Sequence, residues 1–398
     1  MALEPLEIVK NVYWVGAVDW EERDFHRFEI HRGTTYNAYL IVDEKTALID
    51  TVKDEFFGEM AARIRKIVDL SEIDYVVSNH VEMDHSGSLP KIMKLAEKAV
   101  VVCTEAGKKG LCRYYHECEA WNFRTVKTGD ELKLGKKTLM FLEMPMLHWP
   151  DSMATYIKED RLLMPNDAFG QHVASAERFD EELGIEEALK WAKIYYANIL
   201  MPFGDLVRRK LEEVVRLGLA IEMIAPSHGI IWKNPSKIIE AYRRWASFQA
   251  EAKLVTVYDT MWGSTFLLAK AIVEGAESEG VEARLFHVRK DCWAEILTEI
   301  LDSKGLAIGS PTVHNGMFPP VAGFLAYLKS LKPRNKVAVA FSSYGWGGGA
   351  SKEITKLLQD LKFEVLPALD VQYRPTAEDL DKAFSLGRKL AEKIKGSL

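Results

Sequence analysis

The chain has 398 residues, 48% of them hydrophobic and 28% charged, with a formal net charge of −6. This composition is typical of a globular protein, and the length predicts two domains rather than one core. The acidic balance argues against a nucleic-acid partner. No apolar stretch approaches the roughly 18–20 residues that cross a bilayer, so we expect no membrane partner.

The N-terminus and the cysteines suggest where the protein resides. The first residues lack a basic stretch followed by an apolar core, so they do not predict a signal peptide. None of the cysteines, Cys103, Cys112, Cys118 and Cys292, forms a Cys-x-x-Cys pair. That spacing argues against a zinc ribbon, a rubredoxin-type iron site or a disulfide framework. We expect reduced thiols and a cytoplasmic location.

The first 100 residues alternate between short strands and helices. We expect strands over residues 12–15, 36–42 and 46–50, separated by polar turns that are typical of an antiparallel or mixed sheet. Apolar residues at helical spacing predict a helix over 55–68. A strand at 74–78, a helix at 91–97 and a strand at 100–103 follow. The order favours a sandwich of sheets covered by helices.

The stretch that follows the strand at 74–78 carries four candidate metal ligands in six positions, His80, Glu82, Asp84 and His85. In an extended segment the first three alternate and point to one side. Four such groups on a short loop suit a metal pair better than a single ion. The alternative is a polar loop with satisfied side chains.

Three more candidate ligands each follow an apolar strand. His148 comes after the strand at 139–142, Asp167 after a strand that ends near 164, and His228 after the strand at 223–225. A lone histidine or aspartate at such a turn is commonly a capping residue. The repeated pattern instead predicts that these groups gather at one rim of a sheet.

The second half of the chain has a different organisation. An amphipathic helix over 237–252 precedes a new strand at 254–258, so we place the domain boundary near residue 252, with domains 1–252 and 253–398. Helices near 266–279, 293–302, 320–331 and from 350 then alternate with strands at 283–288, 305–309, 337–341 and 364–369, before a terminal helix. This alternation predicts a doubly wound parallel sheet.

Three loops after these strands, residues 259–265, 310–317 and 342–349, are rich in hydroxyls, glycines and aromatic rings. Hydroxyls and backbone N–H groups at a helix N-terminus suit a phosphate monoester, and aromatic rings suit a planar cofactor. The candidate binding residues are Thr260, Met261, Trp262, Gly263, Ser264, Thr265, Ser310, Pro311, Thr312, Asn315, Gly316, Ser342, Tyr344, Gly345, Trp346 and Gly347.

The three loops together resemble flavodoxin, which implies FMN. No Gly-x-Gly-x-x-Gly pattern indicates a dinucleotide. A flavodoxin-like fold without a flavin is the alternative.

The candidate metal ligands resemble those of the metallo-β-lactamase superfamily. Glutamate at position 82, where hydrolases usually carry histidine, resembles its redox branch, the flavodiiron proteins. Carboxylates are hard oxygen donors that suit iron or manganese better than zinc. The resemblance implies one iron held by His80, Glu82 and His148, and a second held by Asp84, His85 and His228. Asp167 would bridge the two irons, and His26, His172 and Tyr195 would line the pocket.

The resemblance covers essentially the whole chain and implies a metallo-β-lactamase-like αβ/βα sandwich followed by a flavodoxin-like domain. Flavodiiron proteins reduce O₂ to water or NO to N₂O with electrons relayed through FMN, and they form head-to-tail homodimers or dimers of dimers. The chain ends soon after its terminal helix, so we expect a separate electron donor, rubredoxin or F420H₂. The preferred acceptor and the donor stay open.

Two other functions compete with this hypothesis. One is a zinc-dependent hydrolase with a flavodoxin-like accessory domain, against which Glu82 argues. The other is an electron carrier or redox sensor whose first half is an inactive relic, against which the complete set of candidate ligands argues.

Overall fold

The computed structural model describes residues 4–26 and 28–397, so the first three residues of the expected N-terminal segment lie outside it. The chain divides into two compact units. The first contains Met1–Tyr195 and Asp205–Arg243, and the second contains Tyr196–Gly204 and Arg244–Leu398. Among the described residues, no helix is both long and apolar enough to cross a membrane.

The first sheet of the N-terminal unit is mixed. Its strands lie in the order β1 (Leu6–Val9), β2 (Val12–Trp14), β7 (Tyr39–Val42), β8 (Thr46–Ile49), β9 (Ile73–Val77), β10 (Val100–Cys103) and β11 (Asn122–Thr125). Pairing is antiparallel from β1 to β8 and parallel from β8 to β11. The expected mixed sheet is confirmed.

The second sheet carries the order β12 (Glu131–Lys133), β13 (Thr138–Glu143), β14 (Met153–Ile157), β15 (Leu162–Met164) and β16 (Met223–Ile224). Only β15 and β16 pair in parallel. Since β13 and β15 both run antiparallel to β14, the carboxyl ends of β13, β15 and β16 meet at one edge. Short pairs add β3 (Ala17–Asp19) to β6 (Thr34–Tyr36), and β4 (Asp24–Phe25) to β5 (Phe28–Glu29).

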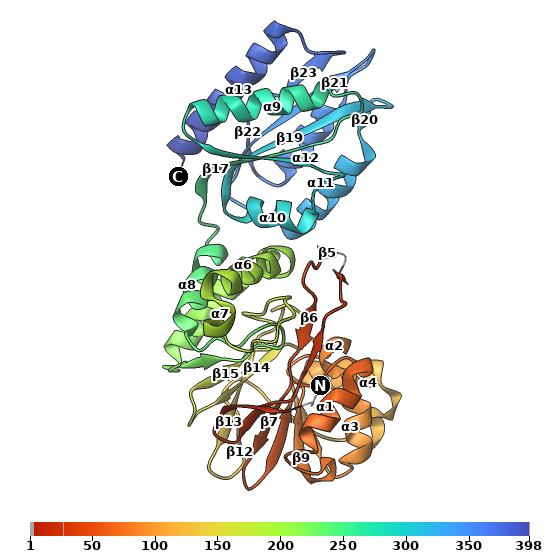
Figure 1. Cartoon of the computed structure of the whole chain (residues 1–398), viewed down its shortest axis with the longest axis vertical. Helices are drawn as coiled ribbons and strands as arrows, with labels where there is room; N and C mark the ends of the chain where they lie inside the picture. The colour runs from red at the N-terminus through yellow and green to blue at the C-terminus, as the bar shows by residue number, and fades with distance from the viewer. Residues whose placement is uncertain (1–3, 27, 398) are drawn as a thin grey trace. The chain divides into compact units, whose positions relative to one another are not determined.

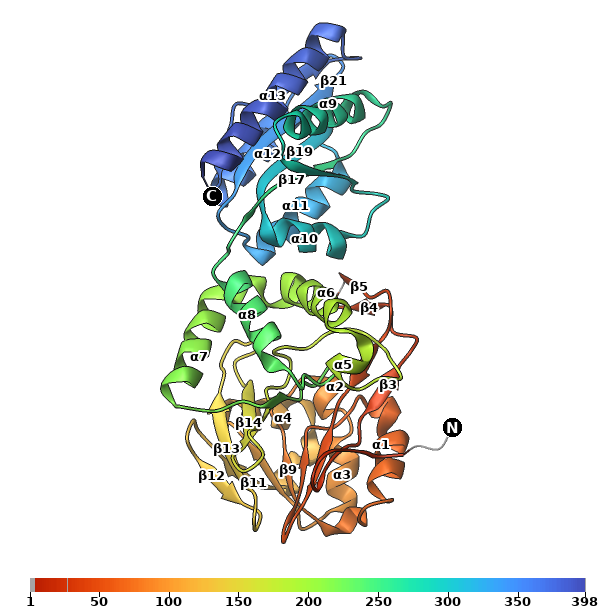
Figure 2. The same cartoon turned by 60° about the vertical axis from the view of Figure 1, so that its left-hand side comes forward.

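Two apolar layers hold this unit together. One lies between the two sheets and includes Trp14, Ile49, Phe141 and Met153. The other lies between the first sheet and helices, among them α1 (Phe57–Ile64), α3 (Leu89–Leu95) and α4 (Glu105–Tyr114). Figure 2 shows α1 and α3 on the outer side of the red and orange strands.

Further helices are α2 (Met83–Ser86), α5 (Asp180–Leu183), α6 (Ile185–Tyr195), α7 (Gly204–Arg216) and α8 (Pro235–Ala246). The predicted sandwich is confirmed.

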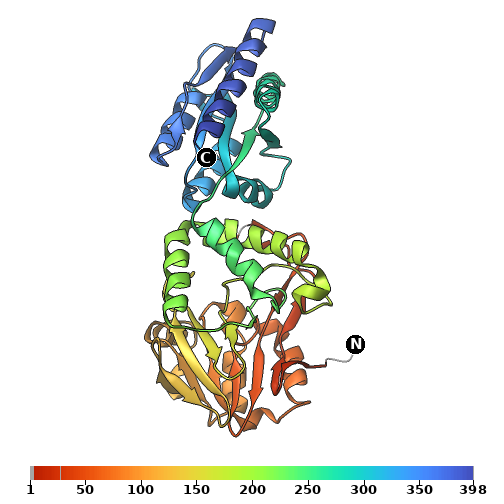
Figure 3. The same cartoon turned by 90° about the vertical axis from the view of Figure 1, so that its left-hand side faces the viewer.

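The C-terminal unit is built on a parallel sheet. Its order is β18 (Glu282–His287), β17 (Glu251–Tyr258), β19 (Ser303–Val313), β21 (Val337–Tyr344) and β22 (Glu364–Val365), while β20 (Gly316–Met317) pairs with β19 and β23 (Leu369–Gln372) with β21. Helices α9 (Ser264–Ser278) and α13 (Ala377–Gly396) pack side by side against it (Figure 1, Figure 3). The remaining helices are α10 (Trp293–Asp302), α11 (Pro319–Leu331) and α12 (Ala350–Asp360). The flavodoxin-like topology is confirmed.

Two predicted elements end differently in the structure. The helix expected to continue to residue 252 stops at Ala246, and Phe248 adopts a φ of +52°, which a helix cannot contain. The strand expected over 364–369 is split into β22 and β23 around Pro367, which has no N–H to donate to a ladder. As a consequence, β23 pairs further along β21 than β22 does.

The expectation of four reduced thiols is wrong for one pair. Cys112 and Cys118 form a disulfide, with their Cα atoms 5.2 Å apart. Cys112 lies in helix α4, which ends at Tyr114, and Cys118 lies in the short 3₁₀ helix η3 (His116–Ala120) that follows it. The two cysteines are six positions apart, so they do not match a Cys-x-x-Cys pattern. Cys103 is a buried thiol, and burial raises its pKa to about 12.

Candidate functional site

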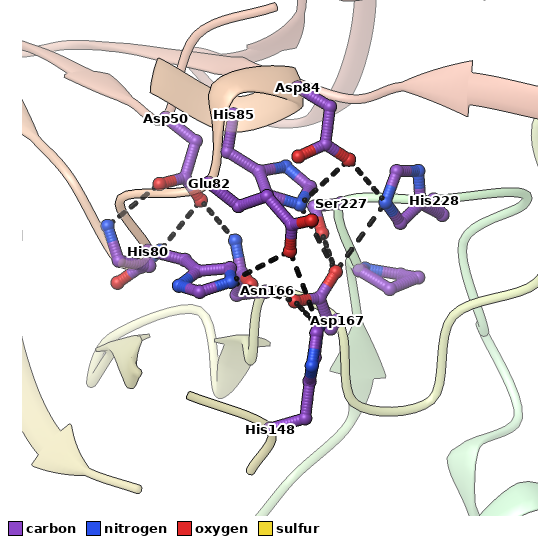
Figure 4. A network of polar contacts seen from close by, with 12 residues as sticks. Asp50, His80, Glu82, Asp84, His85, His148, Asn166, Asp167, Ser227 and His228 are labelled. Carbon is purple, nitrogen blue, oxygen red and sulfur yellow. Dashed lines mark hydrogen bonds and ion pairs between the residues drawn. The ribbon is translucent and has the colours of Figure 1, made fainter. Parts of the chain in front are cut away.

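The predicted metal ligands converge at the carboxyl ends of the strands in the N-terminal unit. His80 and Glu82 follow β9, while Asp84 and His85 lie on the first turn of α2 rather than on an extended segment. His148 follows β13, Asp167 follows β15 and His228 follows β16. Figure 4 shows all seven side chains pointing into one buried space.

Two groups of ligand atoms are separated within this space. The ligand atoms of His80, His148 and Asp167 lie within 4.8 Å of one another, as do those of Asp84, His85 and His228. Glu82 joins the first group, because its Oε2 lies 3.2 Å from His80 Nε2 and 3.5 Å from His148 Nε2.

Asp167 faces both groups at once. Its Oδ2 lies 3.3 Å from His148 Nε2 and 3.7 Å from His80 Nε2. Its Oδ1 lies 3.1 Å from His85 Nε2 and 3.4 Å from His228 Nε2. The carboxylate is almost fully buried and stands at the centre of the cluster (Figure 4). Each of its oxygens therefore belongs to one group of ligands.

Among the residues that the structure describes, several buried atoms in the cluster lack a hydrogen bond. Neither carboxylate oxygen of Asp84 accepts one, although Oδ2 lies 3.1 Å from His228 Nε2. Asp167 Oδ2 and His228 Nε2 also lack hydrogen-bond partners. Unsatisfied polar atoms are costly in a protein interior. Their convergence fits positive ions bound between them, so the residues present fit a two-metal site.

The charges of the cluster also fit a two-metal site. Burial disfavours the imidazolium of His85, but the carboxylates of Asp84 and Asp167 outweigh it and raise the pKa of His85 to about 9. Burial also opposes ionisation of Asp167, yet His85 and His148 hold the pKa of that carboxyl well below its usual value. A proton on His85 thus compensates the carboxylates in the metal-free site, and metal ions replace such a proton when they bind.

Two groups that orient the candidate ligands are not evident from the sequence patterns. Asp151 accepts hydrogen bonds from His80 Nδ1 at 2.9 Å and from the Val81 amide at 2.8 Å. The carbonyl of Thr35 accepts one from His228 Nδ1 at 2.7 Å. Both contacts turn Nε2 of the ring toward the cluster, as metal-binding histidines require.

The three predicted pocket residues surround the same space. His26, on the β4–β5 hairpin, contacts Glu82 Oε1 through its Nε2. His172 is buried and its Nδ1 lies 2.8 Å from the Thr34 hydroxyl, while its Nε2 has no hydrogen-bond partner within residues 4–26 and 28–397. The ring of Tyr195 lies 4.9 Å from the ring of His172. Burial holds the pKa of His172 well below, and that of Tyr195 well above, its usual value, so both stay neutral.

A second site occupies the C-terminal unit. A cavity of about 880 Å³ opens between the loops that follow β17, β19, β21 and β23, a volume within the range of cofactor sites. The predicted residues that line it are Met261, Trp262, Gly263, Ser264, Pro311, Thr312, Asn315, Tyr344, Gly345, Trp346 and Gly347. Six other residues that line the cavity are not predicted by the sequence patterns: Phe266, Leu267, His314, Ser343, Tyr373 and Arg374.

The other predicted loop residues lie beside this cavity without lining it. The Thr265 and Ser343 hydroxyls lie 2.8 Å apart and join two of the loops. Thr260 Oγ1 accepts a hydrogen bond from the Gly263 amide, and Ser310 Oγ accepts one from the Phe318 amide. Ser342 is fully buried and Gly316 lies against Glu353.

Two features of the cavity suit a planar, phosphorylated ligand. Trp262 and Trp346 are each 93% exposed, which is unusual for so large an apolar ring unless something stacks on it. Gly263 precedes α9 with a φ of +89°, which favours glycine and turns the loop at the helix N-terminus. Backbone N–H groups at such an end attract phosphate. The residues present fit FMN.

Comparison with protein families matches both units. Residues 34–229 match the family described as "ODP family beta lactamase", and residues 256–387 match the flavodoxin family. A nitric oxide reductase of Moorella thermoacetica is 49% identical over 396 residues, covering 98% of this chain and 99% of that protein. A coenzyme F420H₂ oxidase of Methanothermobacter marburgensis is 44% identical over 397 residues, covering 98% of each.

Solved structures agree over the full length. The rubredoxin oxygen:oxidoreductase of Desulfovibrio gigas superposes with a TM-score of 0.97 at 36% identity, covering 99% of each chain. The flavodiiron protein of Giardia intestinalis superposes with a TM-score of 0.96 at 35% identity, covering 99% of this chain and 97% of the other.

Proposed function

This chain belongs to the flavodiiron protein family, a family of oxidoreductases, and we propose that it reduces O₂ to water or NO to N₂O at a non-haem di-iron site supplied with electrons through FMN. The observation that carries this proposal is Asp167, whose two oxygens face two separate groups of buried ligand atoms. The names of two relatives support the two acceptors, because one is a nitric oxide reductase and the other a rubredoxin oxygen:oxidoreductase.

We assign His80, Glu82 and His148 to one iron, and Asp84, His85 and His228 to the other, with Asp167 between them. Ligand atoms within each group lie 3.1–3.7 Å apart, close enough to bind one ion between them. Three carboxylates favour iron over zinc because they are hard oxygen donors. When bound, an iron pair supplies two adjacent Lewis acids and the electrons for reduction.

Three further residues shape the space above the ligands. His26 binds the outer oxygen of Glu82, and in the metal-free site this contact fixes the carboxylate. Since His172 and Tyr195 are buried and neutral, each can donate a hydrogen bond to a small ligand without adding charge. We therefore propose His26, His172 and Tyr195 as the residues that set the preference between O₂ and NO.

For FMN, we propose that the isoalloxazine ring stacks on Trp262 and Trp346 and that the phosphate lies at the N-terminus of α9. The candidate residues that lie behind the cavity, Thr265 among them, then hold the binding loops in place. We propose a boundary near residue 252, with the di-iron domain over 1–252 and the FMN domain over 253–398. The matched ranges 34–229 and 256–387 are compatible with it.

The remaining partners are also proposals. The names of relatives support rubredoxin or F420H₂ as the electron donor. We propose a head-to-tail homodimer, or a dimer of dimers, in which the FMN of one subunit serves the irons of the other. A forced monomer should keep both cofactors and lose turnover, and full activity in such a monomer would refute this arrangement. A cytoplasmic location stays a prediction.

The test of the function is an anaerobic assay of protein whose iron and FMN contents are known. Reduced donor is mixed with O₂ or with NO, and water and N₂O are the expected products. Two zinc ions, no flavin absorbance and no reductase activity would overturn the proposal. His26→Phe and Tyr195→Phe should change the ratio of the two activities. An unchanged ratio would mean that the substituted residue does not set the preference between O₂ and NO.

A further inference from the structure

We propose that the Cys112–Cys118 disulfide is a redox-active site, and that its reduction by a dithiol loosens the loop that carries Asp84 and His85. The disulfide lies outside the metal cluster and is used by neither cofactor. Its proposed effect rests on the proposed function, because the property it controls is the retention of iron.

The disulfide joins the last turn of α4 to the 3₁₀ helix η3 that follows it. Cys112 is in the last turn of α4 and Cys118 is in η3, and the two flank Tyr115. The Tyr115 amide donates to the Leu111 carbonyl at 2.8 Å, and the Cys118 amide donates to the Tyr115 carbonyl at 3.1 Å. The covalent bond therefore closes a small ring of chain and fixes where the buried Tyr115 side chain points.

Tyr115 connects this ring to the candidate metal loop. Its hydroxyl lies 2.9 Å from Ser86 Oγ, and Ser86 Oγ donates its own hydrogen to the Val81 carbonyl at 2.6 Å. Because a serine hydroxyl has one hydrogen, Tyr115 must be the donor to Ser86. Ser86 follows His85 directly in α2. The ring thus reaches the loop through two consecutive hydrogen bonds in the protein interior.

Helix α4 also touches the loop directly. A Cβ placed on Gly110 would lie 3.0 Å and 3.1 Å from the two methyl groups of Val81, so the helix backbone packs against this side chain. Val81 stands between His80 and Glu82 in the chain. The part of α4 that leads into the disulfide therefore supports the loop from behind.

The geometry selects a small dithiol or a dithiol protein as reductant. Cys118 is 3% exposed, whereas Cys112 is only partly buried, so an attacking thiolate reaches Cys112 Sγ. A mixed disulfide forms there, the S–S bond breaks and Cys118 leaves and takes up a proton. The second thiol of the reductant then displaces Cys112. Two electrons and two protons reach the cysteine pair, and the dithiol departs as a disulfide.

Reduction should act unequally on the two proposed iron positions. Asp84 and His85 lie in α2 directly before Ser86, which accepts the hydrogen bond from Tyr115, and the His85 carbonyl accepts two more from the Thr51 amide and hydroxyl. His80 is held in addition by Asp151, which comes from the loop before β14. We expect faster loss of the iron assigned to Asp84, His85 and His228, and a smaller effect on the other.

The experiment begins with the holoprotein under anaerobic conditions. Alkylation followed by peptide mass spectrometry measures the state of each cysteine before and after treatment with dithiothreitol, and Cys103 serves as a buried thiol that resists alkylation in the folded protein. Release of iron to a ferrous chelator is then timed in both states. We expect reduction to speed the release of one iron per chain at least five-fold, and reoxidation to restore the slow rate.

Matched variants separate the steps. The Cys112→Ser/Cys118→Ser protein should release iron at the fast rate with or without dithiothreitol, which also controls for binding of iron by the reagent. Tyr115→Phe should leave the disulfide reducible but make the release rate independent of it. Alkylation of both cysteines in the untreated protein, or equal release rates in the two states of the wild type, would overturn the inference. An oxidised protein without two irons would instead refute the proposed function.

Discussion

The two candidate cofactor sites are built on opposite physical principles. The metal cluster is buried and highly charged, and further hydrogen bonds orient some of its side chains, such as the one that His80 donates to Asp151. The cavity of the C-terminal unit is open and lined mainly by loop backbone and aromatic rings, and its two tryptophans project into solvent. One site is defined by direction and charge, the other by shape.

This contrast predicts how each site responds to change. Coordination bonds tolerate neither a changed donor nor a displaced one, so a single substitution in the cluster should be severe. Stacking and backbone contacts are distributed over many residues, so a single substitution in the cavity should weaken binding by a limited factor. The cofactor contents of variants test this contrast directly, because each can be measured without turnover.

Replacing Asp167 with alanine should have the largest effect. The change removes the one carboxylate that faces both groups of ligands and leaves His85 and His148 facing a void. We expect iron to fall from two to less than one per chain and O₂ or NO reduction to fall more than about 100-fold, an effect typical of a lost metal ligand. FMN content, measured by absorbance, should not change. Retention of both irons would contradict the bridging assignment.

Removal of the metal should expose a pH dependence of stability. In the metal-free protein the pKa of His85 is raised to about 9 because Asp84 and Asp167 outweigh the effect of burial. A raised pKa stabilises the folded state fully below the unfolded value near 6.5, and this contribution is lost as the pH rises through about 9. The loss is at most about 3 kcal/mol. Urea denaturation of the metal-free protein from pH 6 to 9.5 measures it.

The iron-loaded protein is the control for this pH dependence, because a neutral imidazole bound to metal carries no such proton. Metal-free His85→Gln should also show a flatter profile than the metal-free wild type. A metal-free protein whose stability rises between pH 7 and 9 would show that the carboxylates around His85 do not act as described.

Sequence patterns predicted the features that depend on residues close together in the chain, and not the contacts between residues far apart in it. The predicted helix at 293–302 matches α10 because its apolar spacing is regular, and the seven candidate ligands could be chosen because each follows a strand. Asp151 escaped detection because its partner His80 lies 71 residues away and nothing local marks the contact. Tyr373 and Arg374 escaped because Pro367 splits the strand that positions their loop. Ligation by the predicted residues stays a prediction until metal is measured.

Replacing Asp151 with asparagine tests whether a residue that orients a metal ligand is as sensitive to substitution as the ligands themselves. Asparagine keeps the shape and one acceptor oxygen but lacks the negative charge that orients His80 and increases its basicity. We expect affinity for iron to fall about 10–100-fold, the usual cost of losing such a partner, measured by competition with a chelator. Asp74→Asn, at an aspartate that pairs with Lys45 on the surface, should leave the affinity unchanged. Equal affinities for iron in the two variants would mean that only the ligands themselves are sensitive to substitution.

The smallest effect should follow substitution of Trp346 by alanine in the open cavity. Because the ring is 93% exposed in the protein without flavin, its removal costs the folded chain almost no packing, and any change reports on the ligand. Loss of one stacking partner, worth about 0.5–1.5 kcal/mol, should raise the Kd for FMN by up to about ten-fold. Trp262→Ala should behave alike and Trp20→Ala, in the other unit, should have no effect. Flavin fluorescence quenching measures each Kd, and iron should stay at two per chain. An effect of 100-fold or more from either tryptophan would mean that the cavity, like the metal cluster, depends on single residues.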